Sequence, residues 1–216
     1  MQMHPSVGCV VMASGLSTRF GSNKLLADFC GKPMLCRAFD AAGTPLLSGK
    51  IVVTRSKEVQ ALCSESGIPV LLHSLPGRND TVRLGLSALR EQIPDLAGCM
   101  FLPGDQPLLS RETVERMILE FYAHHAKGQK ETEQEIFRLG HRSQNGSDPL
   151  VGSPVLFGSG YFAELCALPD GKGGNVLLRK YPAQVHTVYT TAREELADAD
   201  TPDALARLEA IARRPG

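Results

Sequence analysis

The sequence lacks any excess of charge of one sign. Its 216 residues include 23 Lys and Arg and 23 Asp and Glu, so the formal net charge at pH 7 is zero. A broad nucleic-acid-binding or membrane-binding surface needs an excess of basic residues, and these totals do not supply one. Hydrophobic residues make up 43% of the chain, which excludes the low hydrophobicity typical of disordered proteins. The composition therefore indicates a soluble globular protein.

Long apolar runs are also missing, and we expect no secretory signal. No apolar run approaches the roughly 20 residues that a membrane-spanning helix needs. The first five residues contain no basic region, and the apolar stretch that follows them is interrupted by Ser14 and Gly15. This stretch is typical of a strand rather than of a signal peptide. We therefore predict a cytoplasmic protein with neither a membrane nor a nucleic acid as partner.

The cysteines and histidines form no obvious reactive or metal-binding motif. None of the six cysteines forms a Cys-x-x-Cys pair, and Cys9 and Cys99 lie in apolar runs, where a thiol behaves as a small buried hydrophobe. We expect neither a disulfide framework nor a cysteine metal site. His124 and His125 are adjacent near a predicted helix end and point differently, which favours interaction with the helix terminus over metal ligation.

The first 125 residues alternate between short apolar runs and helical patterns. Strands are predicted over residues 7–13, 50–54, 69–73 and 99–102, and helices from residue 34, over 58–66, from a cap at Asp80, and from a cap at Ser110. This alternation is typical of an α/β protein with a largely parallel sheet that is covered on both faces. Ligands of such proteins bind beyond the carboxyl ends of the strands.

The second half begins with a polar excursion over residues 126–148, which is predicted to contain a strand near 135–139. Strands at 154–157 and 185–189 and helices at 163–167 and 175–180 follow. Thr201 is predicted to cap a C-terminal helix that Pro202 opens. Because the chain contains no internal repeat and no linker long enough to separate domains, we predict one domain over residues 1–216.

The loop after the first strand, residues 13–24, has the composition of an anion-binding loop. Its small residues allow backbone N–H groups to turn towards a ligand. Arg19 offers a planar guanidinium and Lys24 a compact charge, and Ser17 and Thr18 add hydroxyls. The loop is not a Walker A motif, because no Gly-Lys-Ser/Thr follows at the required spacing. An ordinary Gly/Ser turn with two solvated cations is the alternative interpretation.

Carboxylates follow the fourth predicted strand and precede the last helix. Asp105 lies at the strand end, and Asp198 and Asp200 lie just before Thr201. Nucleotide-bound Mg²⁺ takes one or two protein carboxylates together with phosphate oxygens, although each Asp taken singly fits a turn or a cap as well. Phosphoryl-type transfer depends on positioning and charge neutralisation, so it needs no side-chain nucleophile. A phosphate acceptor, being ionised already, would need no general base.

Four segments resemble, in order, the signature segments of nucleotidyltransferases of the molybdenum-cofactor type. They are VVMASGLSTRFGSNKLL at 10–26, LPGDQPLL at 102–109, SPVLF at 153–157 and DADTPDAL at 198–205. The resemblance implies a three-layer α/β/α Rossmann-like fold with a mixed, mostly parallel sheet. It also implies an enzyme that transfers a nucleotidyl group from a metal–NTP complex to the phosphate of molybdopterin and releases pyrophosphate.

The resemblance also implies roles for individual residues. Arg19 and Lys24 would hold the triphosphate, and the backbone of residues 13–15 would meet the nucleotide. Mg²⁺, or Mn²⁺ as the alternative, would bind Asp105 and Asp200 with Asp198 nearby. The expected catalytic residues are Arg19, Lys24 and Asp105; the expected nucleotide-binding residues are Ala13, Ser14, Gly15, Ser17, Arg19, Lys24, Arg78, Thr81 and Gly104; and the expected metal ligands are Asp105, Asp200 and Asp198.

The identity of the base rests on one departure from the family pattern and on one further similarity. Guanylyl-transferring relatives usually have L-A-G-G where this chain has Met-Ala-Ser-Gly, and Ser14 adds a hydroxyl where base recognition is expected. The segment GRNDTV at 77–82 is similar to the R-x-x-S-V stretch of cytidylyltransferases acting on methylerythritol phosphate, which would place Arg78 and Thr81 near a cytidine. A helix N-terminus with an ordinary cap is the alternative. These features favour CTP.

We therefore predict a CTP:molybdopterin cytidylyltransferase, with CTP, a molybdopterin-type phosphate acceptor and a receiving molybdenum enzyme as partners. Guanylyl transfer to molybdopterin and cytidylyl transfer to another small phosphate, such as methylerythritol phosphate, remain enzymatic alternatives. A nucleotide- or cofactor-binding accessory protein for a molybdenum enzyme is the alternative without catalysis.

Overall fold

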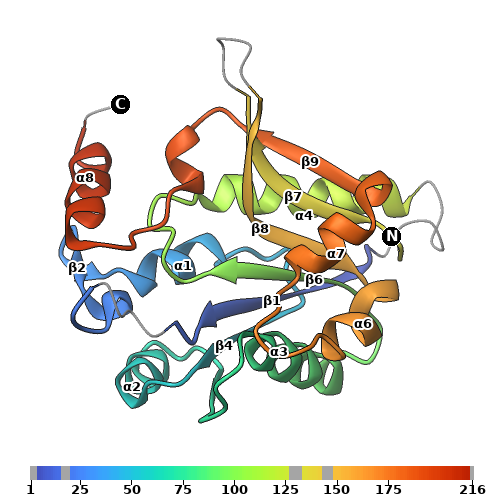
Figure 1. Ribbon diagram of the computed structural model, residues 1–216, viewed down its shortest axis with the longest axis horizontal. Coiled ribbons are helices and arrows are strands. Elements are labelled where there is room, and N and C mark those ends of the chain that lie inside the picture. Colours follow the sequence, from blue (N-terminus) through green and yellow to red (C-terminus); the bar gives the residue numbers. More distant parts are fainter. Residues whose placement is uncertain (1–3, 16–19, 127–132, 143–147, 215–216) are drawn as a thin grey trace.

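A computed structural model describes residues 4–15, 20–126, 133–142 and 148–214 (Figure 1). Its main feature is a seven-stranded sheet in the order β5-β4-β1-β6-β8-β7-β9. The strands are β1 (Ser6–Ala13), β4 (Gly49–Thr54), β5 (Val70–Leu72), β6 (Leu96–Pro103), β7 (Ile136–His141), β8 (Leu150–Gly158) and β9 (Val185–Thr190). A small antiparallel pair, β2 (Asp28–Phe29) and β3 (Lys32–Pro33), lies outside this sheet.

The sheet is mixed but mostly parallel. Strands β5, β4, β1 and β6 are parallel neighbours, β8 is antiparallel to both β6 and β7, and β7 is parallel to β9. Strand β1 lies inside the sheet between β4 and β6 and is almost continuously apolar, because both of its faces are buried. The predicted α/β fold class is confirmed.

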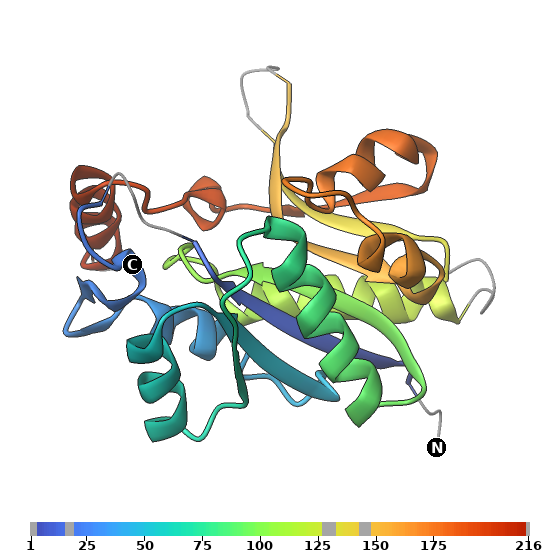
Figure 2. The same cartoon turned by 60° about the horizontal axis from the view of Figure 1, so that its bottom comes forward.

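Helices cover both faces of the sheet. They are α1 (Leu35–Ala41), α2 (Lys57–Glu65), α3 (Arg78–Gln92), α4 (Arg111–His125), α6 (Phe162–Cys166), α7 (Asn175–Lys180) and α8 (Pro202–Ala212), with 3₁₀ turns η1 (Lys24–Leu26), η2 (Ser159–Tyr161), η3 (Pro182–Gln184) and η4 (Arg193–Leu196). Successive side chains of β1 point to opposite faces of the sheet and so belong to two different cores. Val11 lies in the core formed with α1, α2, α4 and α8, whereas Val10 lies in the core formed with α3, α6 and α7. Figures 1 and 2 show these two helical layers.

Helix starts follow the expected capping chemistry, with one correction. The Ser110 and Thr201 side chains accept hydrogen bonds from Thr113 N and Ala204 N, so both predicted caps are confirmed. The cap predicted at Asp80 is wrong. Helix α3 already begins at Arg78, and the Asp80 carboxylate reaches back one turn to accept from Gly77 N at 2.9 Å.

The polar excursion contains β7, which confirms a strand in this part of the chain, but residues 127–132 and 143–147 lie outside the described structure. Within the described residues, none of the helices combines the length and apolar character that crossing a membrane would require.

Candidate functional site

The carboxyl ends of β1 and β6 lie side by side at one edge of the sheet. The two strands are parallel, Met12 is paired with Pro103, and Gly104 N donates to Met12 O at 3.1 Å. A Cβ atom on Gly104 would lie 3.2 Å from Met12 O and 3.0 Å from Leu35 Cδ1, so the close approach of the two strand ends favours glycine here. The loop after Ala13 and the Asp105 segment therefore leave the sheet together, as the sequence predicts.

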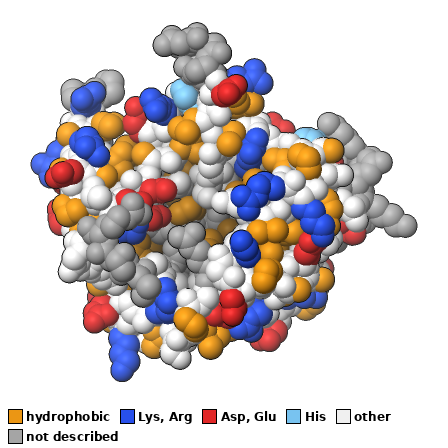
Figure 3. Space-filling model, in the orientation of Figure 1, with side chains coloured by type: hydrophobic (Ala, Val, Ile, Leu, Met, Phe, Trp, Pro, Cys, Tyr) orange, Lys and Arg blue, Asp and Glu red, His pale blue; other side chains and the backbone are white. Residues whose placement is uncertain are grey.

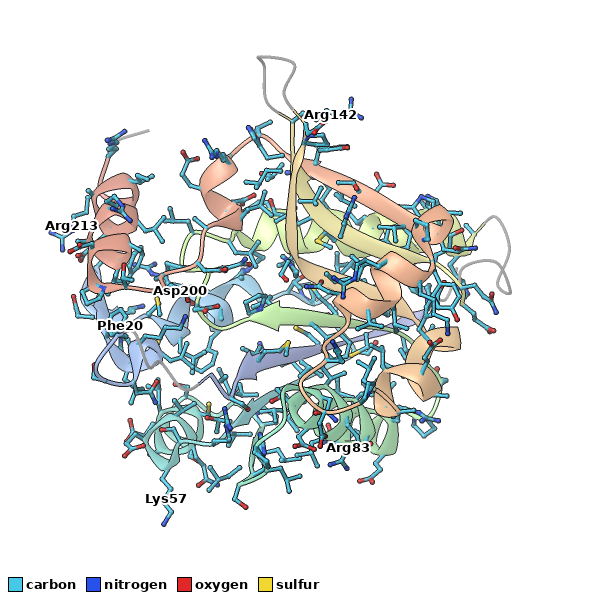
Figure 4. The ribbon with its side chains drawn as sticks, viewed as in Figure 1. Phe20, Lys57, Arg83, Arg142, Asp200 and Arg213 are labelled. Atoms are coloured by element: carbon cyan, nitrogen blue, oxygen red, sulfur yellow. The ribbon has the colours of Figure 1, made fainter. Side chains whose placement is uncertain are left out.

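Lys24 joins the two carboxylates nearest this edge. It begins η1, whose start is held by Asn23 Oδ1 accepting from Leu25 N. Although Lys24 is only 8% exposed, its Nζ donates to Asp105 Oδ2 at 2.5 Å and to Asp200 Oδ1 at 2.7 Å. Asp200 is labelled in Figure 4, and Figure 3 shows acidic and basic side chains close together in this region.

The charge of Lys24 is well supported by its surroundings. Desolvation by burial is the largest single influence on the Lys24 pKa and favours the neutral amine. The hydrogen bonds and negative charges of Asp105 and Asp200 together outweigh it, so the pKa of Lys24 lies above its ordinary value. The site therefore holds an ammonium ion between two carboxylates at neutral pH.

A third carboxylate lies on the same segment as Asp200. Asp198 Oδ1 accepts from Gln106 Nε2 at 3.0 Å, and Ala199 N donates to Asp105 O at 2.9 Å, so the two acidic segments are joined. Desolvation by the surrounding protein, followed by the charge of Asp105, raises the pKa of Asp198, although part of this side chain remains exposed. The negatively charged form of Asp198 is therefore disfavoured beside the other carboxylates.

This arrangement fits a divalent cation that prefers oxygen ligands. Carboxylate oxygens are the donors that Mg²⁺ and Mn²⁺ select. Asp105 and Asp200 already share one positively charged group, the Lys24 ammonium, so their oxygens can converge on a cation. Asp198 is joined to them through the Gln106 and Ala199 contacts. The three aspartates predicted from the sequence as metal ligands are thus brought to one edge of the sheet.

The first turn after β1 is held by the ends of β4 and β5. Ser14 Oγ donates to Val53 O at 3.0 Å and lies 2.9 Å from His73 Nε2. Because the serine proton is already donated, His73 Nε2 carries the proton of this second hydrogen bond, and Nδ1 keeps its lone pair. His73 Nδ1 is buried and has no hydrogen-bond partner among the residues described. The Arg55 guanidinium donates to Ser14 O through both Nε, at 2.9 Å, and Nη2.

His73 makes the stability of this corner depend on pH. Burial, and then the positive charge of Arg55, lowers the pKa of His73; Asp80 opposes this shift and Arg83 adds to it. Between the lowered pKa and the unfolded value of about 6.5, the unfolded chain binds more protons, so stability is lost as the pH falls through this window. We expect His73→Gln to flatten the pH dependence of the thermal unfolding midpoint between about pH 7.5 and about pH 5.5.

His4→Gln is the matched control for this measurement, because His4 is exposed. It should keep the wild-type loss of stability at the lower pH. An unchanged pH dependence in His73→Gln would show that His73 does not carry the effect.

The remaining predicted nucleotide-binding residues differ in burial, and some of them lie outside the described structure. Ala13 is buried and its carbonyl accepts from Thr54 Oγ1, whereas Gly15 is exposed beyond the strand end. Thr81 lies in the first turn of α3 and is 2% exposed. Ser17 and Arg19 lie outside the described residues, and so does the side chain of Arg78, whose backbone begins α3. The roles assigned to these residues stay predictions.

The sequence patterns did not single out Gln106, Arg55 and His73. Each follows a strand of the parallel half of the sheet at its carboxyl end: Gln106 after β6, Arg55 after β4 and His73 after β5. The strand-end rule that selected Asp105 could have found all three.

Comparisons with known proteins identify the family of this chain. Residues 9–186 match the model of the MobA-like NTP transferase domain. A 3-deoxy-manno-octulosonate cytidylyltransferase of Polynucleobacter asymbioticus is 35% identical over 106 residues, which cover 47% of this chain and 42% of that relative. The aligned part is thus about two fifths of the relative's length.

Solved structures share the fold. Rv0371c from Mycobacterium tuberculosis H37Rv superposes with a TM-score of 0.77 at 24% identity, covering 95% of this chain and 98% of that one. A CMP:2-keto-3-deoxy-manno-octonic acid synthetase complexed with CTP superposes with a TM-score of 0.74 at 15% identity, covering 96% and 98%. The match over most of the chain, together with the shared fold, leads to one conclusion: the protein belongs to the family with a MobA-like NTP transferase domain.

Proposed function

We propose that this protein is a nucleotidyltransferase that transfers CMP from metal-bound CTP to the phosphate of molybdopterin and releases pyrophosphate. The observation that carries the proposal is the Lys24 ammonium held between Asp105 and Asp200 where β1 and β6 end. It combines a cation for phosphate oxygens with carboxylates for a metal ion, at the edge from which the small-residue loop leaves the sheet.

The proposed reaction needs little covalent chemistry from the side chains. An oxygen of the acceptor phosphate forms a bond to the α-phosphorus of CTP, and the bond to the β-phosphate breaks, so that pyrophosphate leaves with the electron pair. A bound Mg²⁺ or Mn²⁺ would neutralise charge on the phosphates, with Asp105 and Asp200 as ligands and Asp198 beside them. Lys24 would then exchange its carboxylate partners for phosphate oxygens. The acceptor needs no general base, because it is already ionised.

Metal use has support from relatives. A second structure of Rv0371c, which is 22% identical to this chain, is a complex with manganese. The three aspartates of this chain supply the same kind of hard oxygen donors that manganese and magnesium accept.

Support for the base and the acceptor comes from different observations. CTP is favoured because the matched curated relative is a cytidylyltransferase and a structural neighbour binds CTP. The molybdopterin acceptor is favoured by the family that matches residues 9–186, and by the four ordered segments of the sequence. Cytidylyl transfer to a 3-deoxy-octulosonate sugar acid is the second candidate, because the curated relative has that activity in its name.

The base can be tested by thermal unfolding with Mg²⁺ and each of CTP, GTP, ATP and UTP. A nucleotide at about 100 times its dissociation constant stabilises the folded chain by about 2.7 kcal/mol, or roughly 5–10 °C at this chain length. We expect this shift with CTP and not with the other three. A shift with GTP alone would replace cytidylyl by guanylyl transfer, and no shift with any nucleotide would favour an accessory protein that binds the cofactor and not a nucleotide.

The acceptor is then tested by pyrophosphate release with CTP and either molybdopterin or 3-deoxy-manno-octulosonate. We expect release with molybdopterin only. Release with the sugar acid only would establish the second candidate, and release with neither, despite CTP binding, would contradict both proposed acceptors.

A further inference from the structure

A second cluster of ligand-type side chains lies at the opposite edge of the sheet from Lys24. His124 is in the last turn of α4, Glu135 directly precedes β7, and His186 is the second residue of β9. Because β7 and β9 run in the same direction as β1 and β6, the beginnings of β7 and β9 lie at the edge away from Asp105. Figure 1 shows the three elements next to one another. This cluster is therefore separate from the proposed catalytic site.

The three side chains converge on one point. Glu135 Oε2 contacts His186 Nε2 and lies 3.7 Å from His124 Nδ1. One ligand atom from each residue can be chosen so that all three lie within 4.8 Å of one another. Ligand atoms around a tetrahedral zinc ion stand roughly 3.3 Å apart, given bonds of about 2.0–2.1 Å. Small side-chain rotations thus suffice to place the three atoms around one ion.

The fold holds these side chains in place. The Glu135 carbonyl accepts from Gly158 N at 3.0 Å, and the preceding Gln134 carbonyl accepts from Tyr161 Oη at 2.8 Å. The ring of Phe137, which is 1% exposed, packs against both imidazoles, with ring centroids 5.1 Å from His124 and 5.2 Å from His186. Phe137 is also the direct neighbour of His186 in the parallel β7–β9 pair. The three side chains are thus partly exposed, and packing against the buried Phe137 ring restricts both imidazoles.

The chemistry of these three side chains suits a cation. Glu135 Oε2 and His186 Nε2 are buried atoms that face each other, and His124 Nδ1 lies 3.7 Å from the same carboxylate oxygen. A metal ion at this meeting point would accept lone pairs from all three side chains. Two imidazole nitrogens and one carboxylate oxygen form a donor set that zinc prefers over magnesium.

We propose that His124, Glu135 and His186 form a binding site for a divalent transition-metal ion of the zinc class. Three protein ligands leave a fourth position, which water can fill from the adjoining groove. This groove has a volume of about 540 Å³, and both histidines line it together with Arg116 and Glu120. The ion joins α4, the start of β7 and the edge strand β9, which are distant in sequence, so it stabilises this edge of the folded chain.

The site is tested on the full chain after removal of metals with a chelator. Isothermal titration with ZnCl₂ should show that the wild type binds one zinc ion at this site. The zinc affinity should fall at least about tenfold in His186→Gln and in Glu135→Gln. Residues that only orient a metal ligand already contribute about that much to metal affinity, and loss of a ligand itself costs at least as much. Zinc should also raise the thermal unfolding midpoint of the wild type and not that of the two variants. Glu135→Gln keeps the size of the side chain, so it remains informative if His186→Gln folds poorly.

Two controls distinguish this site from others. His125→Gln removes the adjacent histidine, whose ring lies against Phe121, and should keep zinc binding. Asp105→Asn alters the carboxylates at the other edge of the sheet and should keep zinc binding as well.

Co²⁺ provides a spectroscopic test of the same site. It should give the strong visible absorption of a tetrahedral nitrogen-ligated ion in the wild type, and this signal should be lost in His186→Gln. Unchanged zinc affinity in both ligand variants, or no zinc binding by the wild type, would overturn the proposal.

Discussion

Replacing Asp105 by Asn is expected to reduce nucleotidyl transfer by roughly a thousandfold or more while the chain stays folded. Asp105 lies at the carboxyl end of β6 and accepts a hydrogen bond from Lys24 at 2.5 Å. The substitution keeps the shape of the side chain but removes the negative charge that would hold a divalent cation. Since the metal supplies several kcal/mol of charge stabilisation in the transition state, its loss should appear mainly in kcat.

The measurement is pyrophosphate release at saturating CTP and Mg²⁺, with circular dichroism as the check on folding. Asp203→Asn is the matched control, because Asp203 is an exposed aspartate in the first turn of α8, three residues from Asp200. It should retain wild-type turnover. Activity of Asp105→Asn close to that of this control would remove Asp105 from the proposed mechanism.

Replacing Lys24 by Ala is expected to weaken CTP binding by about tenfold or more. A hydrogen bond to a charged group contributes about 1.5–3 kcal/mol, and every 1.4 kcal/mol is a factor of ten in affinity. The same change leaves Asp105 and Asp200 close together without their shared ammonium. Because these two side chains are 23% and 41% exposed, water screens much of their repulsion, and we expect a loss of only about 1 kcal/mol in the free energy of unfolding.

Titration of CTP in the presence of Mg²⁺ measures the first effect, and urea unfolding without nucleotide measures the second. Lys32→Ala serves as the control, since Lys32 is an exposed lysine in β3. It should change neither quantity. If Lys24→Ala bound CTP as tightly as the control, Lys24 would be a structural residue that holds two carboxylates and not a phosphate ligand.

Local signals in the sequence sufficed for much of the fold. The apolar run of β1 and the capping residues Ser110 and Thr201 act over a few neighbouring residues, so they predicted strands and helix starts. Asp80 shows the limit of such signals. A carboxylate at the N-cap and a carboxylate at the third helical residue can both accept hydrogen bonds from backbone N–H groups at the helix start, so the sequence does not distinguish the two positions. The β2–β3 pair was not predicted, since two-residue strands carry no periodic pattern.

The α/β class and the presence of strand-end aspartates follow from the order of residues alone, because periodicity and strand ends are visible over a few consecutive positions. Which distant side chains meet depends instead on the folded arrangement. Lys24 reaches Asp105 and Asp200 across 81 and 176 positions of the chain. In the same way, the packing of α4, β7 and β9 around Phe137 brings together the two histidines and the glutamate of the proposed zinc site. Such contacts depend on strand order and on packing between layers, which no local pattern specifies.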